Sequence, residues 1–345
     1  MEGEYVEIDG SQYEGGGQIL RFSLALSLIK HRSVRIYNIR GGRKSPGLAE
    51  SHLTALNFLA SSTNSQVTGN TKGSTYVTFI PGEVKTGTYN LNCRTAGSIA
   101  LIFQAVLPVF LNTKSTFVIS GGTDVDFSPC SHFITHVLVP FLSRIGIHIT
   151  YKVEKYGFYP SGQGRVRISI ESSSPHGLIL LENQYFDYHC EFLHTFPKET
   201  NQEHLKFHTQ ELERIKGIIQ ENLEIPEDKI EYKYINVKDK NIVTSLWRDT
   251  SFVPIHISFI NNFRNSEVSV QEKCNELKQE IADMNCVDQF LQDQMLIYLS
   301  IANSPSQVFI KSLTLHTQAV ISLIHQFDLG QISYQNNILF ITPTS

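Results

Sequence analysis

Apolar positions along the chain follow one pattern that occurs three times. In its first occurrence, residues 18–30 are apolar on nearly every side, which predicts an inner helix. Residues 34–38 alternate as a short strand does. A glycine- and arginine-rich loop, a helix over residues 48–60 and strands near 66–68 and 75–80 follow. The predicted unit is therefore helix, strand, loop, helix, strand, strand.

The same order of elements recurs twice. The second copy is predicted as helix 96–111, strand 116–120, loop 121–124, helix 132–145 and strands 147–153 and 165–170; the third as helix 287–302, strand 307–310, loop 313–318, helix 319–327 and strands 331–334 and 338–342. A repeat of ~70–90 residues is longer than solenoid periods. We expect three similar layers around one axis, with the three loops facing a common cleft.

Residues 178–285 break this pattern, because they are richer in charge and in Asn, Gln, Glu and Lys. Helices are expected over 205–222 and 270–284, and strands near 177–181, 188–193, 229–234 and 252–259. The predicted domains are a body of three repeats, residues 1–177 and 286–345, and an insert domain, residues 178–285, between the second and third units.

Composition narrows the class of protein. A hydrophobic share of 41% and a charged share of 18% fit a globular protein with sizeable cores. The net charge of −4 argues against a long polyanion track but allows a local basic pocket. Five scattered cysteines without a CxxC predict free thiols in a reducing compartment rather than zinc. We expect neither a secretory signal nor a membrane span.

Glycines and arginines mark the first unit as a candidate anion site. Glu14 precedes three glycines and Gln18 at the start of the first helix, where phosphate could approach free N–H groups. Taken alone, the three glycines favour a tight turn over a phosphate site. Arg21 shares a helix face with Gln18 and needs Glu14 or an anionic ligand as partner. Arg40 and Arg43 lie in the next loop, either as phosphate forks or as solvated side chains.

The second and third units add an amide, a carboxylate and a histidine. Gln104 interrupts an apolar helix face, so its amide bonds either backbone or the polar edge of a ligand. Asp293 and Gln294 are polar residues in the equivalent helix of the third unit. Asp293 could have a structural role as a helix cap or an ion-pair partner, or it could hold a ribose, a metal or the histidine. His316 lies in the third loop, where a neutral imidazole can act as a nucleophile near pH 7. A solvated histidine is the ordinary alternative.

Several ordered motifs resemble the RNA 3′-terminal phosphate cyclases. They are residues 9–12, 14–21, 39–43, 46–48, 96–98, 104–108, 120–124, 157–160, 291–294 and 313–318, and the last two are most similar to the eukaryotic branch. The resemblance implies an α+β fold, with three repeated units of a four-stranded sheet with two helices, plus a smaller α/β insert domain. It also implies an enzyme that converts an RNA 3′-phosphate to a 2′,3′-cyclic phosphate with ATP, through histidyl-AMP and RNA-ppA intermediates.

The resemblance further implies roles for individual residues. His316 would be the adenylated residue and Glu14 would hold Mg²⁺ or Mn²⁺. Arg21, Arg40 and Arg43 would bind the RNA 3′-phosphate. The ATP contacts would be Gln104, Pro129, Phe290, Leu291, Gln292, Asp293 and Gln294. The implied partner is RNA with a 3′-phosphate end, without DNA-specific or membrane binding. The implied compartment is the nucleus, with the cytoplasm as the alternative.

Two departures from the family pattern leave other functions open. Ser161-Gly162-Gln163-Gly164 replaces a run of three glycines, and residues 245–254 stand where the family has a glycine-rich stretch in the insert. One alternative is a catalytically silent cyclase-like protein of RNA or ribosome assembly, which would lack the nucleophile. Another is a transferase on small phosphorylated metabolites, since enolpyruvyl transferases share the repeat; the His316 motif disfavours it.

Overall fold

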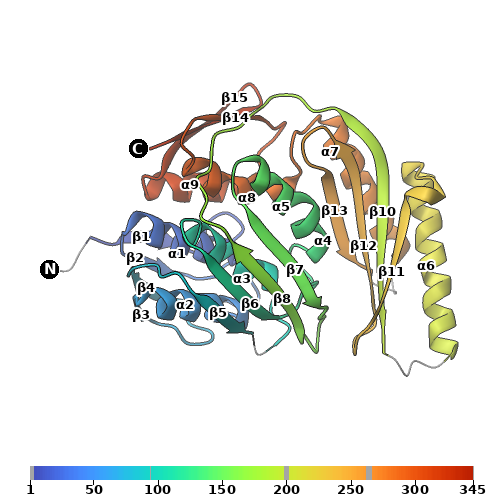
Figure 1. Ribbon diagram of the computed structural model, residues 1–345, viewed down its shortest axis with the longest axis horizontal. Helices are drawn as coiled ribbons and strands as arrows, with labels where there is room; N and C mark the ends of the chain where they lie inside the picture. Colours follow the sequence, from blue (N-terminus) through green and yellow to red (C-terminus); the bar gives the residue numbers. More distant parts are fainter. Residues whose placement is uncertain (1–3, 94, 198–201, 262–265, 345) are drawn as a thin grey trace.

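The first repeated unit is a four-stranded mixed sheet with two helices. The computed structural model describes residues 4–93, 95–197, 202–261 and 266–344 (Figure 1). The unit consists of β1 (Val6–Asp9), α1 (Gln18–Lys30), β2 (Val34–Tyr37), α2 (Glu50–Thr63), β3 (Gln66–Thr68) and β4 (Val77–Ile80). Its strand order is β1-β2-β4-β3, with β1 parallel to β2 and the other neighbours antiparallel.

The second and third units repeat this topology. The second contains β5 (Thr88–Asn92), α3 (Ile99–Val106), β6 (Ser115–Gly121), a helical stretch from α4 (Ser131–Phe133) through a π turn to α5 (Val139–Arg144), β7 (Ile149–Lys155) and β8 (Gly164–Ile170). The third contains β9 (Ile179–Leu180), α8 (Gln289–Ser300), β14 (Ser306–Phe309), α9 (Leu315–Gln326), β15 (Gly330–Gln335) and β16 (Ile338–Pro343). Their strand orders, β5-β6-β8-β7 and β9-β14-β16-β15, match the first. The α+β fold with repeated units is thus confirmed.

Each unit begins with a strand that the sequence pattern did not assign to it. β1 and β5 are short and half exposed, so their apolar signal is weak. Ile179–Leu180 was predicted as part of the insert, but β9 pairs in parallel with β14. That prediction was wrong because two residues carry too little pattern to reveal a partner far along the chain.

The segment from β10 to α7 forms a fourth sheet with its own helices. It contains β10 (Tyr185–Phe196), α6 (Gln202–Leu223), β11 (Ile230–Asn236), β12 (Asn241–Thr250), β13 (Ile255–Ile260) and α7 (Ser266–Ala282), in the strand order β11-β10-β12-β13. A separate apolar cluster, which includes Phe192, Leu246 and Leu277, lies between this sheet and its helices. The segment follows β9, so it interrupts the third unit instead of separating it from the second. The sequence missed β12, which occupies most of residues 245–254.

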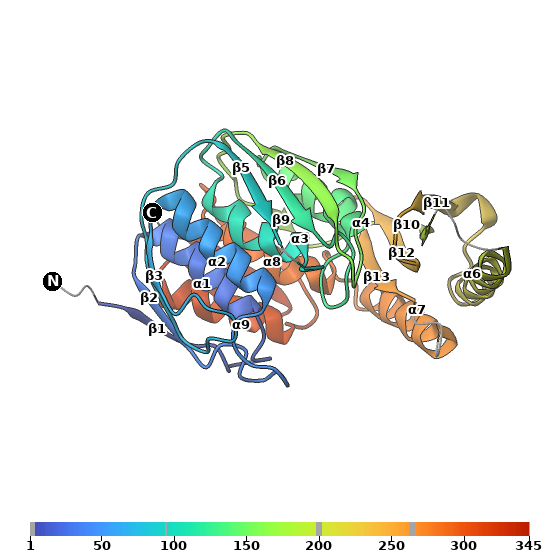
Figure 2. The ribbon, with the colours of Figure 1, turned by 90° about the horizontal axis from the view of Figure 1, so that it is seen from below.

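Helices fill the centre of the body and the sheets lie outside them (Figure 2). α1 packs against α2, α3 and α9, and α8 packs against α9. Eleven of the thirteen residues of α1 are buried, which confirms the predicted inner helix. This packing brings the first turns of α1 and α9, from opposite ends of the chain, to one place.

All five cysteines are buried and unpaired, as expected. No described helix is long and apolar enough to cross a bilayer.

Stacked histidines join the body to the β10–α7 segment. His132 stacks on His136 with ring centroids 3.8 Å apart, and its Nδ1 lies 3.1 Å from Nε2 of His256 on β13. Trp247 on β12 packs against the His132 ring at 4.7 Å. Burial, and then the neighbouring His136, lowers the pKa of His256 to about 3. Burial, and then His256, also lowers the pKa of His132.

We expect acid to destabilise this junction. Between pH 6.5 and the folded pKa the unfolded chain binds more protons than the native one, so the free energy of unfolding falls as pH falls, by up to about 1.4 kcal/mol per pH unit for each group. A His256→Gln variant should show a shallower loss between pH 6.5 and 4 in urea unfolding. The exposed His148→Gln is the control, and an equal slope in wild type and His256→Gln would contradict the assignment.

Candidate active site

His316 lies in the first turn of α9. The sequence predicted a loop over residues 313–318, but the helix begins at Leu315 because Thr314 caps it, with the Thr314 hydroxyl accepting from Thr317 N at 3.0 Å. Gln292 on α8 fixes this turn, since its Oε1 accepts from Thr314 N at 3.0 Å and from the Thr317 hydroxyl at 2.7 Å. The His316 side chain is 43% exposed and therefore reachable from solvent.

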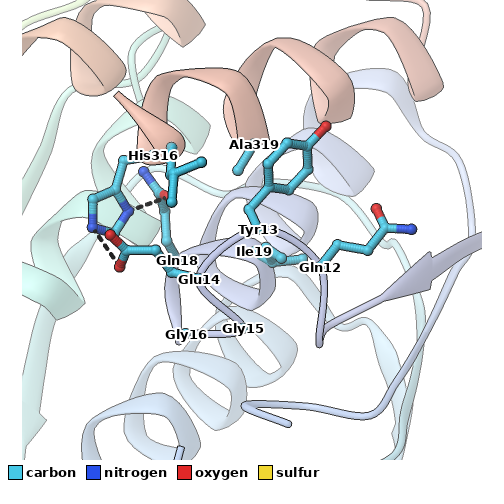
Figure 3. A pocket seen from close by; sticks show the side chains of 10 residues that line it. Gln12, Tyr13, Glu14, Gly15, Gly16, Gln18, Ile19, His316 and Ala319 are labelled. Carbon is cyan, nitrogen blue, oxygen red and sulfur yellow. Dashed lines mark hydrogen bonds and ion pairs between the residues drawn. The ribbon is translucent and has the colours of Figure 1, made fainter. Parts of the chain in front are cut away.

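Both ring nitrogens of His316 have partners from the start of α1 (Figure 3). Nδ1 lies 2.7 Å from Gln18 Oε1, and Nε2 lies 3.0 Å from Glu14 Oε2. The Gln18 amide nitrogen donates to the Asp293 carboxylate, so only its oxygen is available to the histidine. His316 Nδ1 is therefore the protonated nitrogen that donates, and Nε2 is the nitrogen that can act as a nucleophile.

The groups around His316 shift the pKa of its ring in opposite directions. Burial lowers its pKa; Glu14 acts in the raising direction, whereas Arg21 and Arg43 add to the lowering. The ion pair with Glu14 requires a protonated ring, because an imidazole with a bare Nε2 would face the carboxylate with its lone pair. Loss of the Glu14 contact would thus free Nε2 in its neutral, nucleophilic form.

Asp293 and Arg21 are both buried, and each influences the pKa of the other. Burial raises the pKa of Asp293 to about 7, although Arg21 and the Gln18 amide act against this. Burial likewise lowers the pKa of Arg21 to about 10, against the attraction of Asp293. The Arg21 Nε is buried without a hydrogen-bond partner among the described residues. Such an orphaned donor fits an anionic ligand.

Arg40 and Arg43 lie on the loop that faces this start of α1. Arg43 Nη2 is 3.5 Å from Glu14 Oε2, and its guanidinium passes over Gly16. Arg40 has a left-handed backbone (φ 55°), and its Nη1 donates to the Gly47 carbonyl at 2.9 Å. Burial, and then Arg43, lowers the pKa of Arg40. The first unit therefore gathers three arginines, and one of them already pairs with the carboxylate beside His316.

His52 is a site residue that the sequence did not single out. Its Nδ1 accepts from Ala49 N at 3.2 Å, which leaves the proton on Nε2. Burial, and then Arg21 and Arg40, lowers its pKa to about 3, so the ring is neutral beside two cations. Its position at the first turn of α2, just after the arginine loop, was the available signal. Gly17 leaves the space that the ring occupies, since a Cβ there would overlap His52 Nε2.

A Gly17→Ala substitution is expected to reduce the free energy of unfolding by about 1–3 kcal/mol, because a methyl group has no room against His52. Urea unfolding measures this. The matched control is Gly217→Ala on α6, where a Cβ meets nothing within 4 Å. That change should stabilise the helix by about 0.5–1 kcal/mol. Equal effects at the two glycines would disprove the packing argument.

The expected ATP contacts divide into several structural environments. Gln104 is buried on α3 and its Oε1 has no partner among the described residues. On α8, Leu291 is a core side chain, and the Gln294 amide nitrogen donates to the Phe290 carbonyl at 2.7 Å. The half-exposed Phe290 ring packs edge-on against Phe133 at 6.3 Å. Pro129 lies four residues before Phe133. Their assignment to ATP stays a prediction.

A divalent ion would find one accessible carboxylate here. Among the described residues, no group of three or more His, Cys, Asp or Glu side chains could hold a metal ion. Glu14 alone suits Mg²⁺ that keeps its waters and bridges substrate phosphates, which requires few protein ligands.

Comparisons with known proteins agree on one family. The family model described as "RNA 3′-terminal phosphate cyclase" matches residues 12–333. The chain is similar to the RNA 3′-terminal phosphate cyclase of Drosophila melanogaster, with 33% identity over 93% of this chain and 90% of that protein. It is 34% identical to that of Pyrococcus furiosus over 93% of this chain and 92% of the relative. These near-equal identities do not assign the chain to the eukaryotic branch.

Proposed function

The chain belongs to the RNA 3′-terminal phosphate cyclase family, and we propose that it converts an RNA 3′-phosphate end into a 2′,3′-cyclic phosphate at the expense of ATP. One observation carries the proposal. A reachable histidine has its Nδ1 held by Gln18, which is held in turn by Asp293, so that Nε2 is directed toward Glu14 and the arginines.

In the first step His316 Nε2 attacks the α-phosphorus of ATP. A P–N bond forms as the bond to pyrophosphate breaks, which leaves AMP on the histidine. Gln18 Oε1 accepts the hydrogen bond from Nδ1–H throughout. The positive charge that develops on the ring therefore stays beside a fixed amide oxygen and, beyond it, the Asp293 carboxyl. An RNA 3′-phosphate oxygen then takes the AMP and releases His316, and the neighbouring 2′-hydroxyl displaces AMP to close the cycle.

Glu14 controls when Nε2 can react. The 3.0 Å contact between Nε2 and the Glu14 carboxylate is favourable only with a proton on that nitrogen, so the carboxylate must move away before attack. A divalent ion bound at Glu14 would supply charge neutralisation for the triphosphate. With Glu14 turned away from the ring, the remaining influences on the His316 pKa, namely burial, Arg21 and Arg43, would all favour the neutral imidazole.

The arginines suit the second substrate. Arg21 offers a buried unpartnered Nε, and Arg43 can leave its long 3.5 Å contact with Glu14 for a phosphate oxygen. Phe290, which is 37% exposed and packs against the buried Phe133, supplies apolar surface for an adenine ring. We assign the body to residues 1–177 and 286–345 and the insert to 178–285, except that β9 pairs with the body.

We also propose a nuclear location, which rests on the eukaryotic-like motifs.

The experiment that tests the function uses an RNA oligonucleotide with a labelled 3′-phosphate. Incubation with ATP and Mg²⁺ should protect the label from phosphatase, and a cyclic phosphodiesterase should restore its sensitivity. No protection at any ATP concentration, from a protein with native circular dichroism, would refute the proposal.

Arg43→Ala should separate the two half-reactions. We expect self-adenylation to stay within about threefold of wild type, because His316 keeps Gln18 and Asp293. Transfer to the RNA 3′-phosphate should fall by about 10–100-fold, since a charge-assisted hydrogen bond to phosphate is lost. Single-turnover transfer from pre-adenylated protein measures this. Arg32→Ala, a surface arginine paired with Asp328, is the control, and equal loss of both steps would contradict the assigned role.

A further inference from the structure

The outward face of the β5-β6-β8-β7 sheet carries cations that the fold does not require. On β8 the alternate residues Val166 and Ile168 are buried in the body core, so Arg165 and Arg167 point outward. Lys152 on β7 lies directly across from Arg167, and Lys155 lies across from Arg165. Like charges in directly opposed positions destabilise a sheet.

Only part of this charge is neutralised within the sheet. Glu154 contacts both arginines, at 2.8 Å from Arg165 Nε and 2.6 Å from Arg167 Nε. Lys152 and Lys155 are exposed and have no acidic partner among the described residues. In a chain of net charge −4, four cations against one carboxylate on a single face indicate an anionic partner.

Two exposed aromatic rings lie on loops at one end of the strands of this sheet. Phe127, on the loop that follows β6, is 98% exposed, and Tyr159, on the β7–β8 turn, is 74% exposed. The loops are tied together, since Thr123 N donates to the Gly157 carbonyl at 2.8 Å and Gly157 N to the Thr123 hydroxyl at 3.1 Å. Rings with so little contact in the protein gain by stacking on an unpaired base.

Packed side chains connect this end of the sheet with the active site. The loop that bears Phe127 continues through Pro129 into α4, where Phe133 packs against Phe290. Phe290 lies on α8 three residues before Asp293, which holds Gln18 and through it His316. A chain that lies on the sheet and passes these rings would therefore arrive with its end near the histidine.

We propose that the outward face of the β5-β6-β8-β7 sheet binds the single-stranded segment that leads to the RNA 3′ end. Lys152, Lys155, Arg165 and Arg167 hold its phosphates, and Phe127 and Tyr159 stack its bases. The inference rests on the proposed function for the identity of the polyanion. The inference adds a substrate class to the proposed function, namely RNA 3′ ends with several unpaired nucleotides before the terminal phosphate.

The first test reverses the two unpaired charges. Lys152→Glu/Lys155→Glu should weaken binding of a fluorescent single-stranded 12-mer with a 3′-phosphate by at least about tenfold in anisotropy titrations without ATP. The affinity of the variant should depend less steeply on salt than that of wild type. Each lost phosphate contact lowers the slope of log affinity against log salt concentration by about 0.7. The melting temperature should stay equal or rise, since each new carboxylate faces an arginine.

The control is Lys206→Glu/Lys278→Glu, with two exposed lysines on α6 and α7 and the same change in net charge. It should bind RNA within about twofold of wild type. Equal weakening by both double variants, or unchanged binding by the first, would overturn the proposal. Self-adenylation without RNA should be the same in every variant. Failure of wild-type adenylation would instead count against the proposed function and leave the binding result standing.

A second test addresses stacking. Fluorescence of 2-aminopurine placed two or three nucleotides before the 3′-phosphate should be quenched by wild type and by Phe127→Tyr, but not by Phe127→Ala. Binding to Phe127→Ala should weaken about fivefold or more, and a blunt duplex should compete poorly. Equal quenching by all three proteins, or equal competition by the duplex, would rule out a stacking platform for unpaired bases.

Discussion

His316→Asn is expected to reduce self-adenylation by about 1,000-fold or more, because asparagine offers no nucleophilic nitrogen where the P–N bond forms. The assay is transfer of label from α-labelled ATP to the protein, in a linkage that survives denaturation and is released by acid. Folding should be unaffected, since the His316 side chain is 43% exposed and Thr314 still caps α9.

The control for this variant is His31→Asn. His31 is exposed and ends α1 in a left-handed conformation that asparagine accepts readily. It should label as wild type does. Label that persists in His316→Asn would mean that another side chain carries the AMP, and the proposed mechanism would then be wrong.

Gln18→Met is expected to lower the rate of self-adenylation by about 10–100-fold with little change in the ATP concentration needed for half-maximal rate. Methionine has a similar length but cannot accept the hydrogen bond from His316 Nδ1–H or donate one to Asp293. The ring would lose its fixed tautomer and orientation, while adenine and phosphate contacts would remain. Initial rates of labelling against ATP concentration measure both quantities.

Gln326→Met, on the exposed last turn of α9, is the matched control and should behave as wild type. A Gln18→Met protein with an unchanged rate would show that the hydrogen bond to Nδ1 does not position the nucleophile. A lower melting temperature alone would not explain a rate effect measured well below it.

The sequence alone determined the repeated unit and most of its elements. α1 could be located because apolar side chains surround it, β6 because it contains a short apolar run, and β8 because apolar and polar residues alternate along it. His316 could be selected mainly because its motif resembles that of the cyclases, and the repeat added a geometric reason, since it places this junction near arginines. The signals for the individual helices and strands are local, since each depends on residues within one or two turns of the chain.

Tertiary structure decided what local patterns could not express. β9 belongs to the third unit only through its pairing with β14, and β12 is a strand in a segment that offered no clear motif. His52 became a site residue because Gly17, on another helix, leaves space for its ring. The hydrogen bond between His316 and Gln18 spans 298 residues, and the one between Gln18 and Asp293 spans 275. The sequence supplied the histidine, but the packing of α1, α8 and α9 decides which of its nitrogens can react.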